Sequence, residues 1–233
     1  TPLSAPARLP GPGSWPASER LEDWRLEAAM GRGGPVVAAH QSPGEARARA
    51  RLEAFLDAPL DRYATDRDDL AADGSSRLSE NLAQGEVGPR TCWTAALSAL
   101  DRGSPGAEAF LRELAWREFS QHMLHHRPTL AEEPLNPAWA RFPWDEDEGS
   151  PLLRAWRRAR TGLPLVDAGL REMWVTGRMH NRMRMLTASV LVKTFLTDWR
   201  LGLRWFADQL TDWDPAANAL NWQWVAGTGP DSA

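Results

Sequence analysis

The sequence is poor in cysteine and tyrosine, with one of each among its 233 residues. The single thiol, Cys92, excludes an internal disulfide and a zinc site built on several cysteines, and it agrees with a reducing compartment. No stretch approaches the roughly 18 uninterrupted apolar residues of a membrane span, and the N-terminus lacks the basic and then apolar order of a signal peptide. We therefore expect a soluble, cytoplasmic, monomeric protein without membrane contact.

Acidic residues outnumber basic ones, which gives a net charge of −4, yet one block reverses this balance. Residues 151–207 contain 11 Arg and Lys against three Asp and Glu, a local charge of +8 that leaves −12 for the rest. Such a block is either a solvated face or a surface for phosphate groups. Composition does not choose between these interpretations.

Aromatic residues are dominated by tryptophan, with 13 Trp against six Phe. Each indole is a large apolar body with one hydrogen-bond donor, so we expect most of them to anchor the core.

The N-terminal segment is rich in proline. Its first sixteen residues, TPLSAPARLPGPGSWP, contain five prolines, which remove backbone donors and favour extended geometry. We predict a Pro-rich lead-in over residues 1–41 and a helical domain over residues 42–233. Because the chain does not start with Met, it is expected to begin inside a longer protein or to have been trimmed.

The predicted fold class is all-α, since no pair of alternating β-branched runs joined by a hairpin turn is present. A Ser-Pro start and an early Glu predict a helix from Ser42, with Ala46, Ala50 and residues 52–56 on its apolar side. Further helices are expected over residues 90–100, 107–125, 150–160, 167–176, 179–195, 201–210 and 215–225.

The stretch TGRMHNRMRMLTASVL, residues 176–191, combines an apolar stripe with three arginines. The stripe has helical spacing and consists of Met179, Met183, Leu186 and Val190. Arg178, Arg182 and Arg184 interrupt it, and a guanidinium placed against a core needs an anionic or polar partner. Asn181 and Arg184 share a different face, so we predict a helix with an apolar back and a polar front.

The segment DWDPAANALNWQW, residues 212–224, has a clear helix start. Asp214 is a candidate N-cap and Pro215 the first helical residue. Asp214, Asn218 and Trp222 then lie along one face, whereas Trp224 is turned about 200° away from Trp222. The two indoles are expected to have different neighbours, although packing within a bundle explains them equally well.

Two further segments have both a functional and an ordinary interpretation. The loop DGSSRLSEN, residues 73–81, offers a glycine and hydroxyls suited to a pyrophosphate, but also to a capping turn. ELAWREF, residues 113–119, sets an acid, an indole and a guanidinium on adjoining turns, which suits either a base with its phosphates or an amphipathic helix. His122, His125 and His126 lack a further ligand motif, so no metal site is predicted.

Seven segments in order resemble the FAD-binding helical domain of the DNA photolyase and cryptochrome family, most closely that of bacterial class I cyclobutane pyrimidine dimer photolyases. They are YATDRD (63–68), GSSRLS (74–79), ELAWREF (113–119), TGLPLVDAGLREM (161–173), MHNRMRM (179–185), DWR (198–200) and DWDPAANALNWQW (212–224).

The resemblance implies a U-shaped FAD buried in a helical bundle, with its pyrophosphate on the GSSRLS loop. It places Asn218 near the flavin N5 and pairs Arg184 with Asp212. The cofactor contacts that it implies are Tyr63, Ser75, Ser76, Arg77, Leu78, Ser79, Arg117, Asn181, Arg184, Asp212, Asp214 and Asn218.

The implied activity is light-driven repair of cyclobutane pyrimidine dimers in DNA by electron transfer from reduced FAD, with the dimer flipped out of the stack. Trp116 and Trp224 would sandwich the dimer, and Glu113 would hydrogen-bond to its carbonyls. The implied DNA contacts are Arg67, Glu113, Trp116, Arg117, Asn181, Arg182, Met185 and Trp224.

Trp222, Trp199 and Trp144 match the family's tryptophan relay, which photoreduces oxidised flavin, and Trp156 ranks behind them. Asn181 and Met185 stand where enzymes for (6-4) photoproducts have histidines, and Asn218 where many cryptochromes have Asp or Cys. These positions favour dimer repair over the alternative, a cryptochrome-like blue-light sensor. A cofactor-free helical interaction module is a third hypothesis.

The sequence departs from the family pattern in a few places. Arg178 stands where bacterial photolyases usually have Trp, and Ser75 replaces Thr but keeps a hydroxyl. The N-terminal α/β antenna domain and the C-terminal segment of the family are not expected in this chain, which ends with GTGPDSA. An antenna chromophore is therefore not expected on it.

Overall fold

In a computed structural model, which describes residues 11, 13–26, 28 and 33–229, the chain is helical. No strand occurs in these ranges, and a single parallel bridge joins Asp145 to Thr197. Helices come in the order η1 (Leu21–Trp24), α1 (Gly33–Ala38), α2 (Glu45–Asp57), α3 (Pro59–Asp66), α4 (Ser79–Ala83), α5 (Pro89–Asp101), α6 (Ala107–His126), η3 (Pro137–Arg141), α7 (Pro151–Arg157), α8 (Pro164–Thr176), α9 (Asn181–Ser189), the π-helical η4 (Val190–Thr194), α10 (Trp199–Gln209) and α11 (Pro215–Ala226). The predicted all-α class is confirmed.

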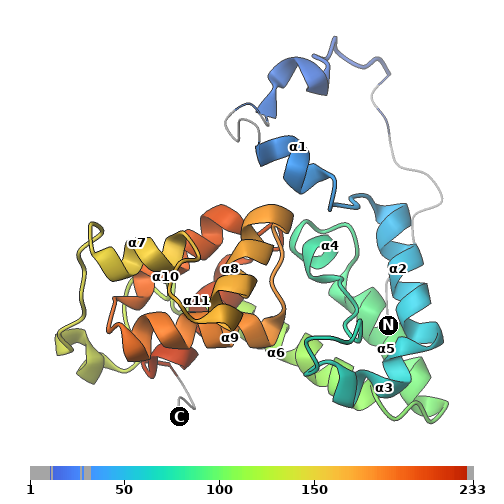
Figure 1. The fold of residues 1–233 in the computed structure, drawn as a ribbon. Coiled ribbons are helices and arrows are strands. Elements are labelled where there is room, and N and C mark those ends of the chain that lie inside the picture. The colour runs from blue at the N-terminus through green and yellow to red at the C-terminus, as the bar shows by residue number, and fades with distance from the viewer. Residues whose placement is uncertain (1–10, 12, 27, 29–32, 230–233) are drawn as a thin grey trace.

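The helices form two groups joined by α6 (Figure 1). In Figure 1, α2 to α5 lie on one side of α6, and α7 to α11 lie on the other. Each group has its own buried apolar cluster, one drawn from residues 48–114 and the other from residues 130–226. We call the group of α2 to α5 the N-terminal half and the group of α7 to α11 the C-terminal half. The first turns of α6 contribute to the cluster of the N-terminal half, and its Met123 and Leu124 pack against the cluster of the C-terminal half. Helix α6 therefore holds the two halves together.

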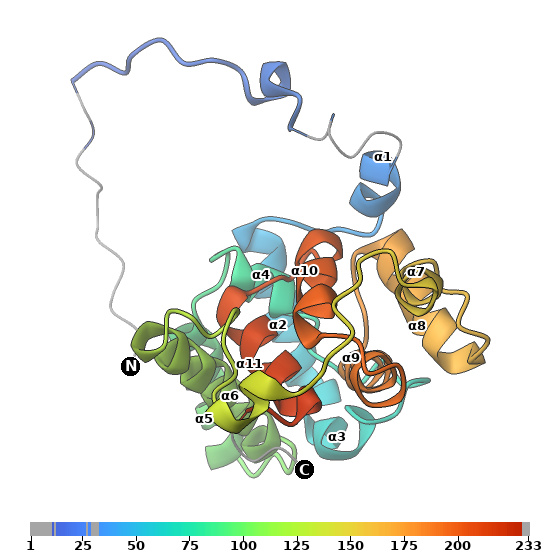
Figure 2. The same cartoon turned by 90° about the vertical axis from the view of Figure 1, so that its left-hand side faces the viewer.

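The predicted lead-in contains short helices in the structure. Helix α1 stands at one end of the molecule, above the two groups (Figure 2), and it packs against α8. Gln41 Nε2 donates a hydrogen bond of 2.9 Å to the carbonyl of Thr176, which ties the end of this segment to the C-terminal half. The prolines at positions 2, 6, 10 and 12 lie outside the described residues.

Two predictions about individual helices were wrong. Residues 179–195 do not form one helix, because His180 has an extended ψ of 142° and its Nδ1 accepts from the Arg182 amide, which starts α9 at Asn181. After Ser189 the backbone continues as the π-helical turn η4. On α2, the buried face is Ala48, Leu52 and Phe55, while Ala46 and Ala50 are exposed.

No helix among the described residues is long and apolar enough to cross a membrane.

Candidate functional site

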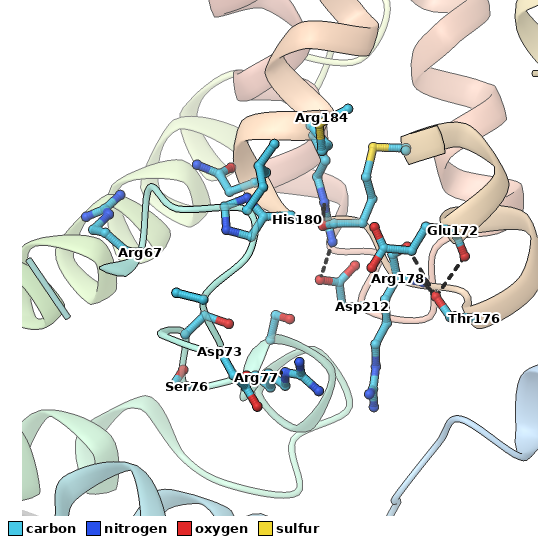
Figure 3. Close-up of a pocket in the computed structure, with 18 of the residues that line it drawn as sticks. Arg67, Asp73, Ser76, Arg77, Glu172, Thr176, Arg178, His180, Arg184 and Asp212 are labelled. Atoms are coloured by element: carbon cyan, nitrogen blue, oxygen red, sulfur yellow. Dashed lines mark hydrogen bonds and ion pairs between the residues drawn. The ribbon is translucent and has the colours of Figure 1, made fainter. Parts of the chain in front are cut away.

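Two large cavities adjoin each other between the two halves. Their volumes are about 770 Å³ and about 810 Å³. The first, shown in Figure 3, is lined by residues 75–79, and we call it the loop cavity. The second is lined by Trp116 and Trp224, and we call it the indole cavity. Both are lined by Tyr63, Arg67, Ser76, Ser79, Glu113, Asn181, Arg184 and Asp212.

A third, inner cavity of about 100 Å³ adjoins both of them. Asn218 and Trp222 line it, together with three residues that line both larger cavities, namely Asn181, Arg184 and Asp212. The stretch at residues 176–191 therefore contributes Asn181 and Arg184 to all three cavities, as its polar front predicted.

Nearly all the predicted site residues line this system. Besides the eight residues shared by both large cavities, the loop cavity is lined by Ser75, Arg77 and Leu78, the indole cavity by Trp116, Arg117, Arg182, Met185, Asp214 and Trp224, and the inner cavity by Met185, Asp214, Asn218 and Trp222. Among the described residues, the exceptions are Trp144 and Trp199, which line none of the three cavities.

An ion pair between Arg184 and Asp212 lies where the cavities meet (Figure 3). Arg184 Nη2 donates to Asp212 Oδ2 at 2.8 Å, and its Nε donates to the Met179 carbonyl at 2.9 Å. Burial opposes the charge of Asp212. The charge and hydrogen bond of Arg184, with smaller contributions from the Ser79 hydroxyl and a backbone amide, outweigh burial and hold the pKa of this carboxyl below its usual range. The other oxygen, Oδ1, is buried and has no hydrogen-bond partner among the described residues. A ligand with a donor group would satisfy it.

Helix α11 begins as predicted. Asp214 Oδ1 accepts hydrogen bonds from the amides of Ala216 and Ala217 at 3.0 and 2.9 Å. Its Oδ2 accepts from Gln121 Nε2 at 2.7 Å, and Arg117 Nη2 lies 3.6 Å from it. This one carboxylate therefore caps α11 and ties it to α6.

The cap sends the two indoles of α11 to opposite sides. Trp222 is 2% exposed, and its ring packs edge-on against Phe206 and Trp156, with centroids 4.9 and 6.4 Å away. Its Nε1 is buried without a partner among the described residues. Trp224 is 37% exposed and lines the indole cavity. The predicted division between the two indoles is confirmed.

The room for Trp222 comes from Gly202 on α10, which no motif pointed to. A Cβ at this position would lie 2.2 Å from Trp222 Cη2 and 2.7 Å from Leu191 Cδ2. Since such contacts do not occur between real atoms, only glycine fits there.

The loop at residues 73–79 is shaped by Gly74 and Arg77. A Cβ on Gly74 would lie 2.3 Å from Asp66 Cβ, so the close approach predicted for this glycine is to the end of α3. Arg77 has a φ of 51°, and its side chain pairs with Asp73 at 2.9 Å. Ser75, Ser76 and Ser79 line the loop cavity on both sides of this turn.

Glu113, which lines both large cavities, pairs with Arg67. The Arg67 guanidinium also lies 5.4 Å above the ring of Tyr63, which packs edge-on against Phe55 and Phe110. Burial raises the pKa of Tyr63 to about 12, so its hydroxyl stays neutral. Arg67 thus links the Glu113 carboxyl to the neutral phenol of Tyr63.

The remaining arginines of the 176–191 stretch also have acidic partners. Arg178 forms two hydrogen bonds with Glu80, and Arg182 forms two with Asp68, at 2.8 and 2.7 Å. The need for partners was predicted, whereas their identity was missed because they lie 98 and 114 residues away in the sequence.

Trp199 and Trp144 belong to one substructure. Trp199 is 1% exposed, and Trp144 precedes the bridge that joins Asp145 to Thr197, two residues before Trp199. The ring contact that the structure gives Trp222 with another tryptophan is with Trp156. The order of a relay among these indoles stays a prediction.

The chemistry of the walls is divided. Hydroxyls and cations line the loop cavity, flat aromatic surfaces line the indole cavity, and a buried ion pair lies between them. No three His, Cys, Asp or Glu side chains within the described ranges are placed to hold a metal ion. This arrangement suits a long organic ligand with a diphosphate, next to a second site for planar groups.

Comparison with a protein-family model identifies residues 110–233 as a match to the FAD-binding domain of DNA photolyase. The chain is 43% identical to the deoxyribodipyrimidine photo-lyase of Agrobacterium fabrum over 100% of its length and 48% of that protein. It is 45% identical to the enzyme of a Thermus thermophilus strain over 94% of the chain and 50% of that protein. The chain thus spans about half the length of these curated relatives.

Solved structures give the same result. A class III photolyase from Agrobacterium tumefaciens superposes with a TM-score of 0.89 at 44% identity, over 97% of this chain and 46% of that one. A cryptochrome from Synechocystis superposes with a TM-score of 0.76 at 34% identity, over 82% of this chain and 40% of that one. The likeness to class I enzymes in particular stays a prediction.

Proposed function

The chain belongs to the DNA photolyase family through its FAD-binding domain, and from this premise we propose that it holds FAD between its two halves and repairs pyrimidine dimers in DNA with light. The observation that carries the proposal is the pair of cavities that meet at the Arg184–Asp212 ion pair. One has the polar groups that a dinucleotide needs, and the other has the indoles that an unstacked base pair needs.

The residues of the loop cavity fit FAD. Three serine hydroxyls offer donors to a diphosphate, and Arg184 adds a positive charge that its bond to Asp212 fixes in place. The unpartnered Asp212 Oδ1 and Trp222 Nε1 are an acceptor and a donor that a polar ligand satisfies. Tyr63, Arg117, Asn181, Asp214 and Asn218 would complete its surroundings.

The residues of the indole cavity fit the lesion. Trp116 is 52% exposed and Trp224 37% exposed, so both offer ring faces to flipped bases. Glu113 presents a carboxylate held by Arg67, with Met185 and Asn181 beside it. Arg182 and Arg117 lie at this side and supply positive charge toward a phosphate backbone.

When bound and reduced, FAD supplies the electron that opens the cyclobutane ring and takes it back afterwards. The chain's own residues orient the two partners and exclude water. Trp222, buried next to the inner cavity, is placed to pass an electron toward the cofactor, with Trp199 and Trp144 as the proposed continuation. Trp156, in ring contact with Trp222, is an additional candidate.

The test is repair of a dimer-bearing oligonucleotide by the FAD-loaded, reduced chain under blue light. Glu113→Gln and Trp224→Ala are expected to lower repair at least tenfold. Glu108→Gln, on the exposed side of the same helix, and Trp93→Ala, at a 41% exposed indole, are matched controls that should repair normally. Equal repair by all four variants would disprove the assignment of the indole cavity.

The second candidate function, a blue-light sensor, is favoured by the likeness to the Synechocystis cryptochrome. A chain that binds FAD and is photoreduced, yet repairs no dimer, would favour the sensor. A chain that binds no FAD would favour the third hypothesis, a cofactor-free helical interaction module.

Other features stay predictions: a domain boundary near residue 42, a monomeric state, and a cytoplasmic location. Gel filtration with light scattering tests the second of these directly.

A further inference from the structure

Two adjacent buried residues of α4 bond to opposite halves of the molecule. Glu80 is 8% exposed and Asn81 is 1% exposed, although one is charged and the other polar. Helix α4 has only five residues and follows directly on the loop that lines the loop cavity. The contacts that fix α4 therefore also fix the loop that lines the cavity.

Glu80 reaches the C-terminal half. It accepts two hydrogen bonds from Arg178, one of them from Nε at 2.8 Å, and a third from Thr211 Oγ1 at 2.5 Å. Thr211 is itself fixed at the Gly177 carbonyl, which accepts a hydrogen bond of 2.9 Å from its amide. Its position three residues before Asp214 connects this group to the turn that caps α11. We call Arg178, Glu80 and Thr211 the clasp.

Asn81 reaches the N-terminal half. Its Oδ1 accepts from Arg51 Nη1 at 2.6 Å, and its Nδ2 donates to Glu86 Oε2 at 2.6 Å. The same Arg51 nitrogen donates to the Arg77 carbonyl at 3.0 Å, which fixes the turn of the loop. On this side the loop and α4 are bound to α2 of their own half.

The loop cavity is thus closed across the two halves by the clasp. Arg178 lines the cavity, and Figure 3 shows it extending past Asp212 toward the side on which Arg77 lies. Its side chain is 25% exposed and that of Glu80 10%, so the pair is shielded from water. Another ion pair that joins the halves is Arg182 with Asp68. Its side chains are 42% and 47% exposed, so it is much weaker.

We propose that the clasp is a positioning device for the cofactor: the Arg178–Glu80–Thr211 contact holds the serine loop against the C-terminal half and sets how slowly FAD leaves the loop cavity. This inference rests on the proposed function. None of the three residues needs to touch the cofactor. Breaking the clasp frees α4 on one side only, because Asn81 still binds Arg51 and Glu86.

The experiment measures FAD release from the loaded chain, followed as the rise in flavin fluorescence after dilution. Glu80→Gln and Arg178→Gln should each release FAD about ten to a hundred times faster than wild type, since a bond to a buried charge is lost. The double variant should be no faster than the faster single one. Arg178→Lys keeps the charge, so its rate of FAD release should lie between those of wild type and Arg178→Gln. The matched control is Arg204→Gln, which breaks the exposed pair with Glu148 at 3.1 Å and should release FAD at the wild-type rate.

Amide hydrogen exchange of the FAD-free chain separates positioning from general destabilisation. In Glu80→Gln, faster exchange confined to residues 73–83 supports the clasp, whereas faster exchange in every helix overturns it. The clasp would also be overturned by release rates within twofold of wild type for both single variants. A double variant whose increase in release rate equals the product of the two single increases would overturn it as well. Failure of the wild-type chain to take up FAD would instead disprove the proposed function, and with it this inference.

Discussion

The two halves of the molecule are packed with different aromatic residues. The buried rings of the N-terminal half are Phe55, Tyr63 and Phe110, whereas those of the C-terminal half include Trp156, Trp199 and Trp222. Because the proposed electron relay consists of tryptophans, it lies in the C-terminal half. The N-terminal half, with none in its buried cluster, supplies a wall and a set of polar contacts.

The halves also differ in where their buried polar groups lie. In the N-terminal half, Glu80 and Asn81 are neighbours on one short helix at the cavity. In the C-terminal half such groups are spread widely and often support loops. Gln223 shows this, since its amide bonds to the carbonyls of Leu130 and Glu133 and accepts from the Leu135 amide. The N-terminal half concentrates these groups at the site, whereas the C-terminal half places Asp212 at the site and uses others, such as Gln223, to fasten long connections.

The largest expected effects come from two glycines, one in each half. In Gly106→Ala the new Cβ would lie 1.8 Å from the Leu60 carbonyl oxygen, and in Gly202→Ala 2.2 Å from the Trp222 ring. We expect the free energy of unfolding to fall by about 3 kcal/mol for the first, whose neighbour is backbone, and about 2 kcal/mol for the second. Urea denaturation measures both.

These two variants should differ in photochemistry. Once loaded with FAD, Gly202→Ala should be photoreduced more slowly because Trp222 is displaced, and Gly106→Ala at the normal rate. The control Gly88→Ala, whose Cβ meets nothing closer than 3.7 Å, should lose less than about 1 kcal/mol. The reverse pattern would refute the division of labour between the halves.

The next effect is a loss of folding stability at alkaline pH that comes from buried groups of the N-terminal half. The pKa of Tyr63 is about 12 in the folded chain and about 10 when unfolded, so the folded state holds its proton over this window. Stability is therefore fully present below pH 10 and falls as the pH rises toward 12, by about 2 to 3 kcal/mol from this group. Cys92, whose pKa burial raises to about 11, acts in the same direction. Tyr63→Phe should flatten the alkaline loss in urea titrations, and an unchanged slope would contradict the prediction.

The smallest effect concerns the C-terminal half at acidic pH. Because the folded pKa of Asp212 is lowered, its pairing with Arg184 stabilises the chain above the unfolded pKa of about 4 and is lost as the pH falls through the folded value. Asp212→Asn should cost about 1 to 2 kcal/mol at pH 7. It should also lose less stability than wild type between pH 5 and pH 2. Parallel pH profiles would show that the pair does not stabilise the fold.

The long helices were predictable from the sequence, and the central ion pair from the resemblance to the family. The helix expected over residues 107–125 is present as α6, and the Asp-Pro start of α11 is a local signal with which the structure agrees. Helices α3 and α4 were missed because they are short, and α4 is held mainly by distant side chains that leave no periodic pattern nearby.

The site was predicted in its residues but not in its connections. The resemblance supplied the pairing of Arg184 with Asp212, and simple electrostatics required partners for Arg178 and Arg182. The identity of those partners, and the need for glycine at 106 and 202, depend on which surfaces meet in the folded chain. Such information is absent from any single segment.

The cap of α11 has a consequence for how this region tolerates change. Because each residue turns a helix by about 100°, a start displaced by one position would swing both indoles a quarter-turn away from their present directions. Insertions between Asp214 and Trp222 would thus misdirect two aromatic rings at once, while substitutions on the exposed flank of the helix would leave their directions intact. The spacing from Asp214 to the two indoles is therefore a length that cannot change without rotating both rings.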